Sequence, residues 1–139
     1  MFEIQNTKEI PLLRVNAHVF KHSKFGCTHL HLDCDSTEKA FSVAFRTIPK
    51  DHSGIAHILE HTVLCGSEKF PVRDPFFMMT RRSLSTFMNA MTYPDITAYP
   101  FATLNDKDYR NLLSVYLDAA FFPNIDELDF MQEGHRFCL

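Results

Sequence analysis

The stretch SGIAHILEHTVLCGSEK, residues 53–69, combines a helical apolar pattern with two histidines and a glutamate. Within it, residues 55–65 predict a helix of about three turns. His57 and His61 stand four positions apart, which places both imidazoles on one face of that helix. Glu60 lies beside them on the same flank. The three side chains can therefore meet at a single metal ion and a water molecule next to it.

The order H-x-x-E-H assigns a role to each of the three residues. Neutral imidazole is a good ligand for Zn²⁺, and a carboxylate beside the metal can accept a proton from the activated water. An ordinary buried helix that carries polar residues is the alternative. His57, Glu60 and His61 interrupt a run of apolar residues, and burying such groups costs free energy unless they are paired or bind a metal. This cost favours a catalytic metal site.

A catalytic zinc usually has three protein ligands, so one more is needed. Cys65 continues the spacing of the histidines, but about 12 Å of helix rise separates it from His57. We therefore interpret Cys65 as a packing residue at the end of the helix. Glu127 and Glu133 are possible partners of the metal, and their spacing selects neither of them.

A second pair of histidines, His29 and His31, shares one face of a predicted strand. We favour a polar, solvent-facing surface as the interpretation of this pair. A minor metal site is the alternative.

The composition indicates a globular chain of one domain, because 45% of its 139 residues are apolar and 14 are Phe. The formal charge of −3 comes without a basic stripe, so we expect neither nucleic acid nor an anionic membrane surface as a partner. The cysteines, Cys27, Cys34, Cys65 and Cys138, show no C-x-x-C spacing. We interpret them as reduced thiols of an intracellular protein.

The first twenty residues resemble neither a secretory signal nor an Arg-rich transit peptide. No apolar run approaches the ~20 residues that span a bilayer. We therefore expect a cytoplasmic protein of the bacterial type. The mitochondrial matrix or another organelle is the alternative, if a targeting segment is missing from this sequence.

Apolar and polar residues alternate at 28–34 and 41–46, and residues 15–22, 83–92 and 96–103 also indicate strands. Helical patterns occur at 55–65, 76–82, 106–121 and 126–134. The segment 15–22 is the first predicted strand. Asp35 and Ser36 form a turn, which predicts that 28–34 and 41–46 pair as antiparallel neighbours. The order of these elements predicts an α+β fold, with an antiparallel-rich sheet and helices packed on one face.

Several residues mark the predicted ends of the helices. Ser53 is the expected N-cap of the first helix, and Gly66 is its expected end. Asn105 is the expected N-cap of the long helix, which Pro123 terminates. Asp108, three residues after Asn105, predicts a capping box.

Four blocks carry a resemblance to a known family: HILEHTVLCGSEKFPVRDPFFMM, RRSLSTFMNAMTYPDITAYPFAT, NLLSVYLDAAFFP and LDFMQEG. Together they closely resemble the amino-terminal portion of the presequence-protease branch of the pitrilysin/insulinase family of zinc peptidases. The resemblance is strong from residue 41 to residue 134 and weaker over the first forty residues. Several long blocks in one order are far more specific than the H-x-x-E-H motif alone.

The resemblance implies a zinc metalloendopeptidase that degrades short unstructured peptides, including cleaved targeting peptides, inside a closed chamber. His57 and His61 match the two histidine ligands of the family, and Glu60 matches its general base. Asn89 and Ala90 match positions that contact the substrate backbone, and the strand-like pattern at 83–92 agrees with an edge that accepts an extended peptide. A structural amide near a turn is the alternative for Asn89.

The third ligand of the family is a glutamate well downstream, past Leu139, and neither Glu127 nor Glu133 matches it. We therefore expect residues 1–139 to be a partial amino-terminal metallopeptidase domain, truncated before that ligand and inactive alone. The remainder of the peptidase chain would be needed to close the chamber. A non-catalytic peptide-binding or assembly subunit is the alternative function. Such a subunit would be expected to lack one of His57, Glu60 and His61, and all three are present.

Overall fold

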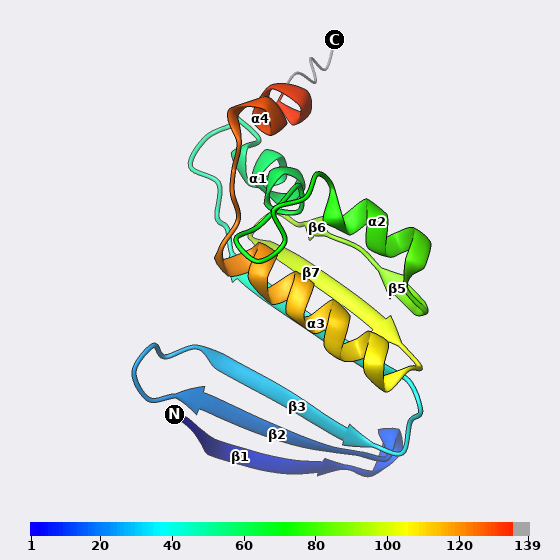
Figure 1. Ribbon diagram of the computed structural model, residues 1–139. Helices are drawn as coiled ribbons and strands as arrows, with labels where there is room; N and C mark the ends of the chain where they lie inside the picture. Colours follow the sequence, from blue (N-terminus) through cyan, green and yellow to red (C-terminus); the bar gives the residue numbers. More distant parts are fainter. Residues whose placement is uncertain (135–139) are drawn as a thin grey trace. The chain divides into compact units, whose positions relative to one another are not determined.

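The computed structural model describes residues 1–134, and the chain divides into two compact units. The first unit is Met1–Thr37, and the second begins at Glu38 (Figure 1). No helix within residues 1–134 is long and apolar enough to cross a membrane. The expectation of one partial domain over residues 1–139 stays a prediction.

The first unit is a three-stranded antiparallel sheet in the order β1-β2-β3. Its elements are β1 Phe2–Ile10, the 3₁₀ helix η1 Pro11–Leu13, β2 Val15–His22 and β3 Thr28–Cys34. The strands β2 and β3 have the bounds predicted for them. However, 15–22 is not the first strand, because β1 precedes it. Residues 5–9 are all polar, so the sequence of β1 shows no apolar alternation that would have revealed this strand, and a bulge between Ile4 and Asn6 shifts its register.

The predicted pairing of 28–34 with 41–46 is wrong. The neighbour of β3 is β2, with His31 opposite His18, whereas β4 Lys39–Arg46 pairs with β7 Ile96–Thr103 in a different sheet. Alternation shows that a strand has one apolar face, but it does not show which strand satisfies its backbone hydrogen bonds. Residues 35–38 therefore join two sheets instead of closing a hairpin.

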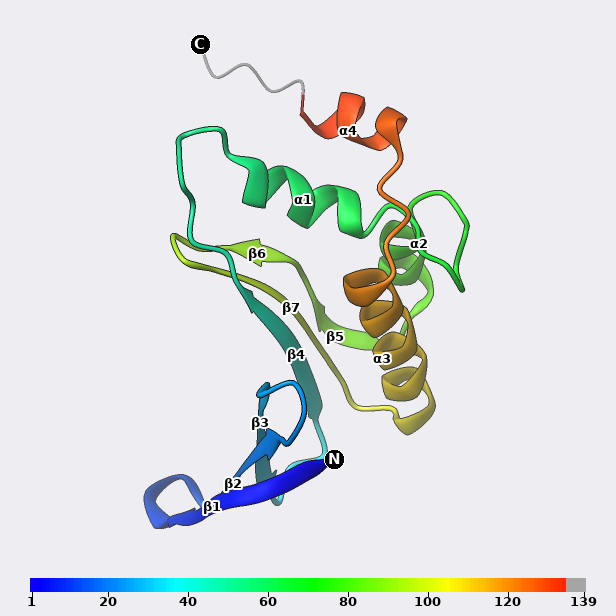
Figure 2. The ribbon, with the colours of Figure 1, turned by 90° about the vertical axis from the view of Figure 1, so that its left-hand side faces the viewer.

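The second unit contains a sheet in the order β4-β7-β5, with β6 also paired to β7. The predicted strand 83–92 is split into β5 Ser85–Met88 and β6 Met91–Thr92, both antiparallel to β7. Asn89 and Ala90 form the break between the two pieces, and the Asn89 N–H still donates to the Pro100 carbonyl (3.1 Å). The edge opposite β4 is therefore an irregular strand (Figure 2).

The helices of the second unit are α1 Ile55–Val63, α2 Pro75–Arg82, α3 Asp106–Phe121 and α4 Glu127–Glu133. The core forms where α3 packs on β7. Phe101 of β7 is 1% exposed and lies 5.0 Å, between ring centroids, from Tyr116 of α3, while Leu112 is fully buried. Alternate residues of β7 point to this core, as a half-buried strand requires. The predicted α+β class, with helices against one face of an antiparallel sheet, is confirmed.

The start of α3 is held by side chains of the preceding strand. Asn105 caps the helix as predicted, because its Oδ1 accepts hydrogen bonds from the backbone N–H groups of Lys107 and Asp108 (3.0 Å each). The capping box is not formed. Asp108 Oδ2 instead accepts from the hydroxyls of Thr103 (2.9 Å) and Ser83 (3.1 Å), and the Asn105 N–H donates to Thr103 Oγ1 (3.3 Å).

We predict that Asp108→Ala lowers the free energy of unfolding by about 1–3 kcal/mol. The carboxylate is buried, and its loss leaves the Ser83 hydroxyl without its acceptor and the Thr103 hydroxyl with only the Leu84 carbonyl (3.2 Å). Urea denaturation of the 139-residue chain measures the effect. Asp106→Ala is the matched control: Asp106 lies in the same turn but is exposed and pairs with Lys39, so its loss should cost clearly less. Equal losses in the two variants would contradict the role given to Asp108.

Candidate metal centre

The helix that carries the H-x-x-E-H residues, α1, begins after Gly54. Gly54 has φ +70°, a conformation that only glycine adopts at low cost, and its carbonyl accepts from the N–H groups of His57 (3.0 Å) and Ile58 (3.1 Å). The prediction of Ser53 as N-cap is wrong, because no side chain caps this helix. The Ser53 N–H donates to Asp51 Oδ1 (3.0 Å), so Asp51 shapes the turn that leads into Gly54.

The end of α1 is fixed by the loop that follows it. The helix ends at Val63, two residues before the predicted end, and Leu64 is its C-cap. Gly66 lies inside the loop, where a Cβ would stand 3.2 Å from the Val72 carbonyl oxygen. Further on, the Lys69 N–H donates to Asp118 Oδ2 of α3 (2.8 Å). The loop after α1 is thus tied to α3, the helix that packs on the sheet.

Burial differs among the three residues of the motif. Glu60 is 6% exposed, whereas His57 is exposed and His61 is intermediate. The argument that burial makes these groups costly therefore applies to Glu60 alone. The side of α1 that faces the protein also buries Thr62 and Val63. The helix holds a carboxylate against the protein and presents two imidazoles to solvent.

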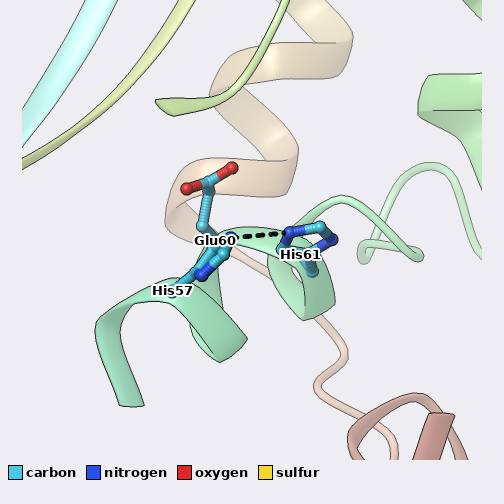
Figure 3. Close-up of side chains that lie close together, drawn as sticks. All are labelled: His57, Glu60 and His61. Atoms are coloured by element: carbon cyan, nitrogen blue, oxygen red, sulfur yellow. Dashed lines mark hydrogen bonds between the residues drawn. The ribbon is translucent and has the colours of Figure 1, made fainter. Parts of the chain in front are cut away.

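The two imidazoles face each other through their Nε2 atoms, which are 3.1 Å apart (Figure 3). The ring centroids are separated by 4.9 Å. Two imidazole nitrogens on one tetrahedral zinc, each about 2.0–2.1 Å from the ion, stand about 3.3 Å apart. The side chains of His57, Glu60 and His61 offer ligand atoms that all lie within 4.8 Å of one another. The donor set therefore fits a metal ion without rearrangement of the helix.

Within residues 1–134, these three residues form the single group of His, Cys, Asp and Glu side chains whose ligand atoms converge in this way. The sequence and the structure thus select the same cluster.

Tyr99 of β7 lies close to the carboxylate of Glu60. Burial raises the pKa of the Tyr99 hydroxyl to about 12, and the negative charge of Glu60 adds to this effect. The phenol therefore stays protonated and neutral at physiological pH.

Glu133 of α4 contacts His61 on the ring nitrogen that faces away from His57. The distance from Glu133 Oε2 to His61 Nδ1 is 3.1 Å, and the Glu133 side chain is 16% exposed. A carboxylate that accepts the Nδ1–H of a histidine leaves the Nε2 lone pair free for a metal and fixes the orientation of the ring. Glu133 thus contacts the ring of His61 and lies outside the converging group. Sequence spacing could not reveal it, because no local pattern links α4 to α1.

We predict that Glu133→Gln weakens zinc binding by about tenfold, the low end of the usual effect of altering the hydrogen-bond partner of a ligand, because the Gln amide oxygen can still accept from the Nδ1–H. Gln preserves the size of the side chain but removes the charge that stabilises the Nδ1–H of His61. Competition with a chromophoric chelator measures the affinity. Glu127→Gln, on the same helix and outside the converging group, should leave the affinity unchanged. Unchanged affinity in Glu133→Gln would show that the contact does not orient His61.

Cys65 lies just after the end of α1, and its interpretation as a packing residue stays a prediction. Its Sγ is 3.5 Å from the His61 carbonyl oxygen, and the thiol lies outside the converging group. Burial raises the pKa of Cys65 to about 12, and the charges of Asp129, Asp74 and Glu133 add to this effect. Without a metal beside it, the thiol therefore stays protonated at physiological pH.

Cys27, Cys34 and Cys65 form no disulfide in the part of the chain that the structure describes. Cys138 lies outside the described residues.

Asn89 and Ala90 lie in the break between β5 and β6. The Oδ1 atom of Asn89 accepts from the Ala90 N–H (2.9 Å), and the Asn89 carbonyl accepts from the Tyr116 hydroxyl (3.4 Å). Asn89 is exposed, whereas Ala90 is partly buried against the core. Their predicted contact with a substrate backbone stays a prediction.

Comparison with known proteins points to one family. Residues 46–136 match the insulinase family, peptidase family M16. The chain is 56% identical, over 136 residues, to the mitochondrial presequence protease of Candida albicans and 56% identical, over 135 residues, to that of Mus musculus. Each alignment covers 97% of this chain but 13% of the relative. The chain thus spans about an eighth of the length of these relatives.

Solved structures agree on the fold. The chain matches the crystal structure of pitrilysin with a TM-score of 0.77 and 21% identity, over 95% of this chain and 14% of that one. It matches a protease from Helicobacter pylori with a TM-score of 0.72 and 21% identity, over 84% of this chain and 28% of that one. The sheet and helices of this chain therefore correspond to part of a pitrilysin-like fold.

Proposed function

The chain belongs to the insulinase family of peptidases, family M16, and from this membership and the geometry of α1 we propose that it forms the metal-binding part of a zinc metalloendopeptidase. The observation that carries the proposal is the convergence of His57, Glu60 and His61, with the two Nε2 atoms 3.1 Å apart. Zinc is the metal of choice because two imidazoles and carboxylates are ligands that it accepts readily. A third ligand, a glutamate downstream of Leu139, would complete the set.

The side chains divide the chemistry of peptide hydrolysis among them. When bound, zinc supplies Lewis-acid polarisation of the scissile carbonyl and of a water molecule. Glu60 accepts a proton from that water as its oxygen bonds to the carbonyl carbon. The same carboxylic acid then donates the proton to the leaving amine as the C–N bond breaks. His57 and His61 would hold the metal, and Glu133 contacts His61 Nδ1 and would fix the orientation of that ring.

The substrates that we propose are short unstructured peptides, including targeting peptides of the presequence type. An extended peptide can add to the irregular edge formed by β5 and β6, where Asn89 and Ala90 interrupt the regular ladder. Exposure of Asn89 supports its proposed contact with the substrate backbone. The rest of the peptidase chain would be needed to enclose the peptide.

The relatives from Candida albicans and Mus musculus are mitochondrial presequence proteases. Their location supports the organelle alternative over the expected bacterial-type cytoplasm. We propose the mitochondrial matrix as the compartment.

Two forms of the protein test the proposal: the chain of 139 residues, and the same chain with its natural downstream sequence. Zinc content and cleavage of a fluorogenic unstructured peptide are measured for both forms. We expect weak zinc binding and little turnover from the shorter form, and one zinc per chain with turnover from the longer form. Full turnover by the 139-residue form would contradict the need for a third ligand and an enclosing wall.

A further inference from the structure

Four histidines lie on one face of the sheet in the first unit: His18, His22, His29 and His31. They come from β2 and β3, where strand alternation puts every second residue on the same face. None of them takes part in the site on α1, which belongs to the second unit. Their arrangement must therefore be explained separately.

Three of the imidazoles are neighbours across and along the strands. His18 stands directly opposite His31 in the antiparallel ladder, and their ring centroids are 6.0 Å apart. His29 precedes His31 by two residues on the same strand, and those ring centroids are 6.5 Å apart. His31 is thus the middle member of a group of three imidazoles, one from β2 and two from β3.

The fourth histidine, His22, is committed to a turn. Its Nδ1 accepts hydrogen bonds from the backbone N–H groups of Lys24 (3.2 Å) and Phe25 (3.1 Å). The ring also stacks on Phe25, with 4.9 Å between centroids. These contacts occupy its Nδ1 lone pair and hold the ring against the turn, so His22 is not available as a ligand.

His18 is held in a way that suits metal binding. Its Nδ1 lies 3.1 Å from Thr7 Oγ1 of β1. When Nδ1 carries the proton and donates to this hydroxyl, the Nε2 lone pair is free and the ring is oriented. The Thr7 hydroxyl would then orient the ring of His18, as the Glu133 carboxylate would orient the ring of His61.

We propose that His18, His29 and His31 form a second metal site, for a divalent d-block ion such as Zn²⁺. Three neutral imidazoles are a donor set that these ions accept, and hard cations such as Mg²⁺ and Ca²⁺ do not. The rings are stacked rather than converged, so binding requires them to rotate. His29 and His31 are exposed, which leaves them free to change rotamer. Asp33, which follows His31 by two residues on β3, adds a negative charge on the same face.

The alternative interpretation is that the rings of His18, His29 and His31 only pack against their neighbours and bind no metal. His29 also contacts the rings of Phe2 (6.0 Å) and Phe20 (5.7 Å), so part of the group has aromatic neighbours. Packing alone would make His31 replaceable without any effect on metal affinity. A metal site requires it, because His31 is the member that adjoins both of the others.

Calorimetric titration with Zn²⁺ alone tests the proposal. The 139-residue chain carries His57→Ala and His61→Ala, so that the first site does not contribute. We expect one zinc per chain, and an affinity that falls by roughly tenfold or more in His31→Gln and in His18→Gln, because each loses one of three ligands. His52→Gln is the matched control, since His52 is an exposed histidine of the second unit. It should leave the affinity unchanged.

Imidazole NMR signals of the unsubstituted chain give a second, residue-resolved measurement. On addition of Zn²⁺, the ring signals of His18, His29 and His31 should shift together, while those of His22 and His52 should not. Equal zinc affinity in His31→Gln and its parent, or unshifted signals from the three rings, would overturn the proposal. Neither result bears on the proposed peptidase. In the calorimetric titration the first site is removed by substitution, and in the NMR titration the ring signals of His57 and His61 are followed separately from those of the second site.

Discussion

Glu60→Gln lowers peptide turnover by about 10²–10⁴-fold in the chain with its natural downstream sequence, the range expected for loss of a general base. Gln has nearly the same shape as Glu but cannot accept the proton of the attacking water. Glu60 is buried beside His57 and His61, and its oxygen lies within 4.8 Å of their ligand nitrogens. The metal should remain, because the two imidazoles are unchanged. Steady-state cleavage of a fluorogenic peptide and zinc content by mass spectrometry measure the two effects.

Glu68→Gln is the matched control for this experiment. Glu68 is exposed in the loop after α1, outside the converging group, so turnover should stay at the parent level. A Glu60→Gln protein that keeps both its zinc and its turnover would contradict the role of Glu60. It would instead support a binding or assembly subunit that retains the fold of the family.

The combined change His57→Ala and His61→Ala weakens zinc binding by more than about 100-fold. Loss of an outer-shell partner alone costs 10–100-fold, and this variant loses two ligands. His57 is exposed and His61 is partly exposed, so the fold should survive and far-UV circular dichroism should be unchanged. Equilibrium dialysis against buffered zinc measures the affinity at the first site, with His18, His29 and His31 replaced by Gln to remove the second site.

His52→Ala in the same background serves as the control for the histidine changes. Its imidazole is exposed and lies outside the converging group, so zinc affinity should not change. Zinc that stays bound without His57 and His61 would mean that the first site lies elsewhere in the chain.

The elements that the sequence predicted well are those with strong local patterns. Residues 28–34 alternate cleanly, and the predicted strands 15–22, 28–34 and 96–103 have the bounds of β2, β3 and β7. Asn105 is the N-cap of α3, as predicted, and the helix begins at the next residue. Short-range periodicity and capping are local properties, so the sequence alone reveals them.

The failures concern interactions that are not local. The partner of β3 is β2 rather than β4, and only long-range packing decides that choice. At the start of α1, Gly54 takes a positive φ and Asp51 binds Ser53, so the capping role expected of Ser53 disappears. Asp108 binds two hydroxyls from preceding segments in place of the backbone of its own helix.

The same distinction applies to the metal centre. His57, Glu60 and His61 were predicted because one helix carries all three at fixed spacing. The contact between Glu133 and His61 was not predicted, because it depends on how α4 lies against α1. The second group of histidines is an intermediate case. The sequence places His29 and His31 on one face, and the strand register then adds His18.

X-ray absorption of the zinc-loaded chain with its natural downstream sequence tests the central claim most directly, with His18, His29 and His31 replaced by Gln. The account predicts two imidazole nitrogens at about 2.0–2.1 Å from the zinc, with oxygen ligands at similar distances and no sulfur. In His61→Ala the imidazole scattering should fall as zinc binding weakens. A sulfur ligand at about 2.3 Å, or an unchanged imidazole signal in His61→Ala, would contradict a zinc site on α1.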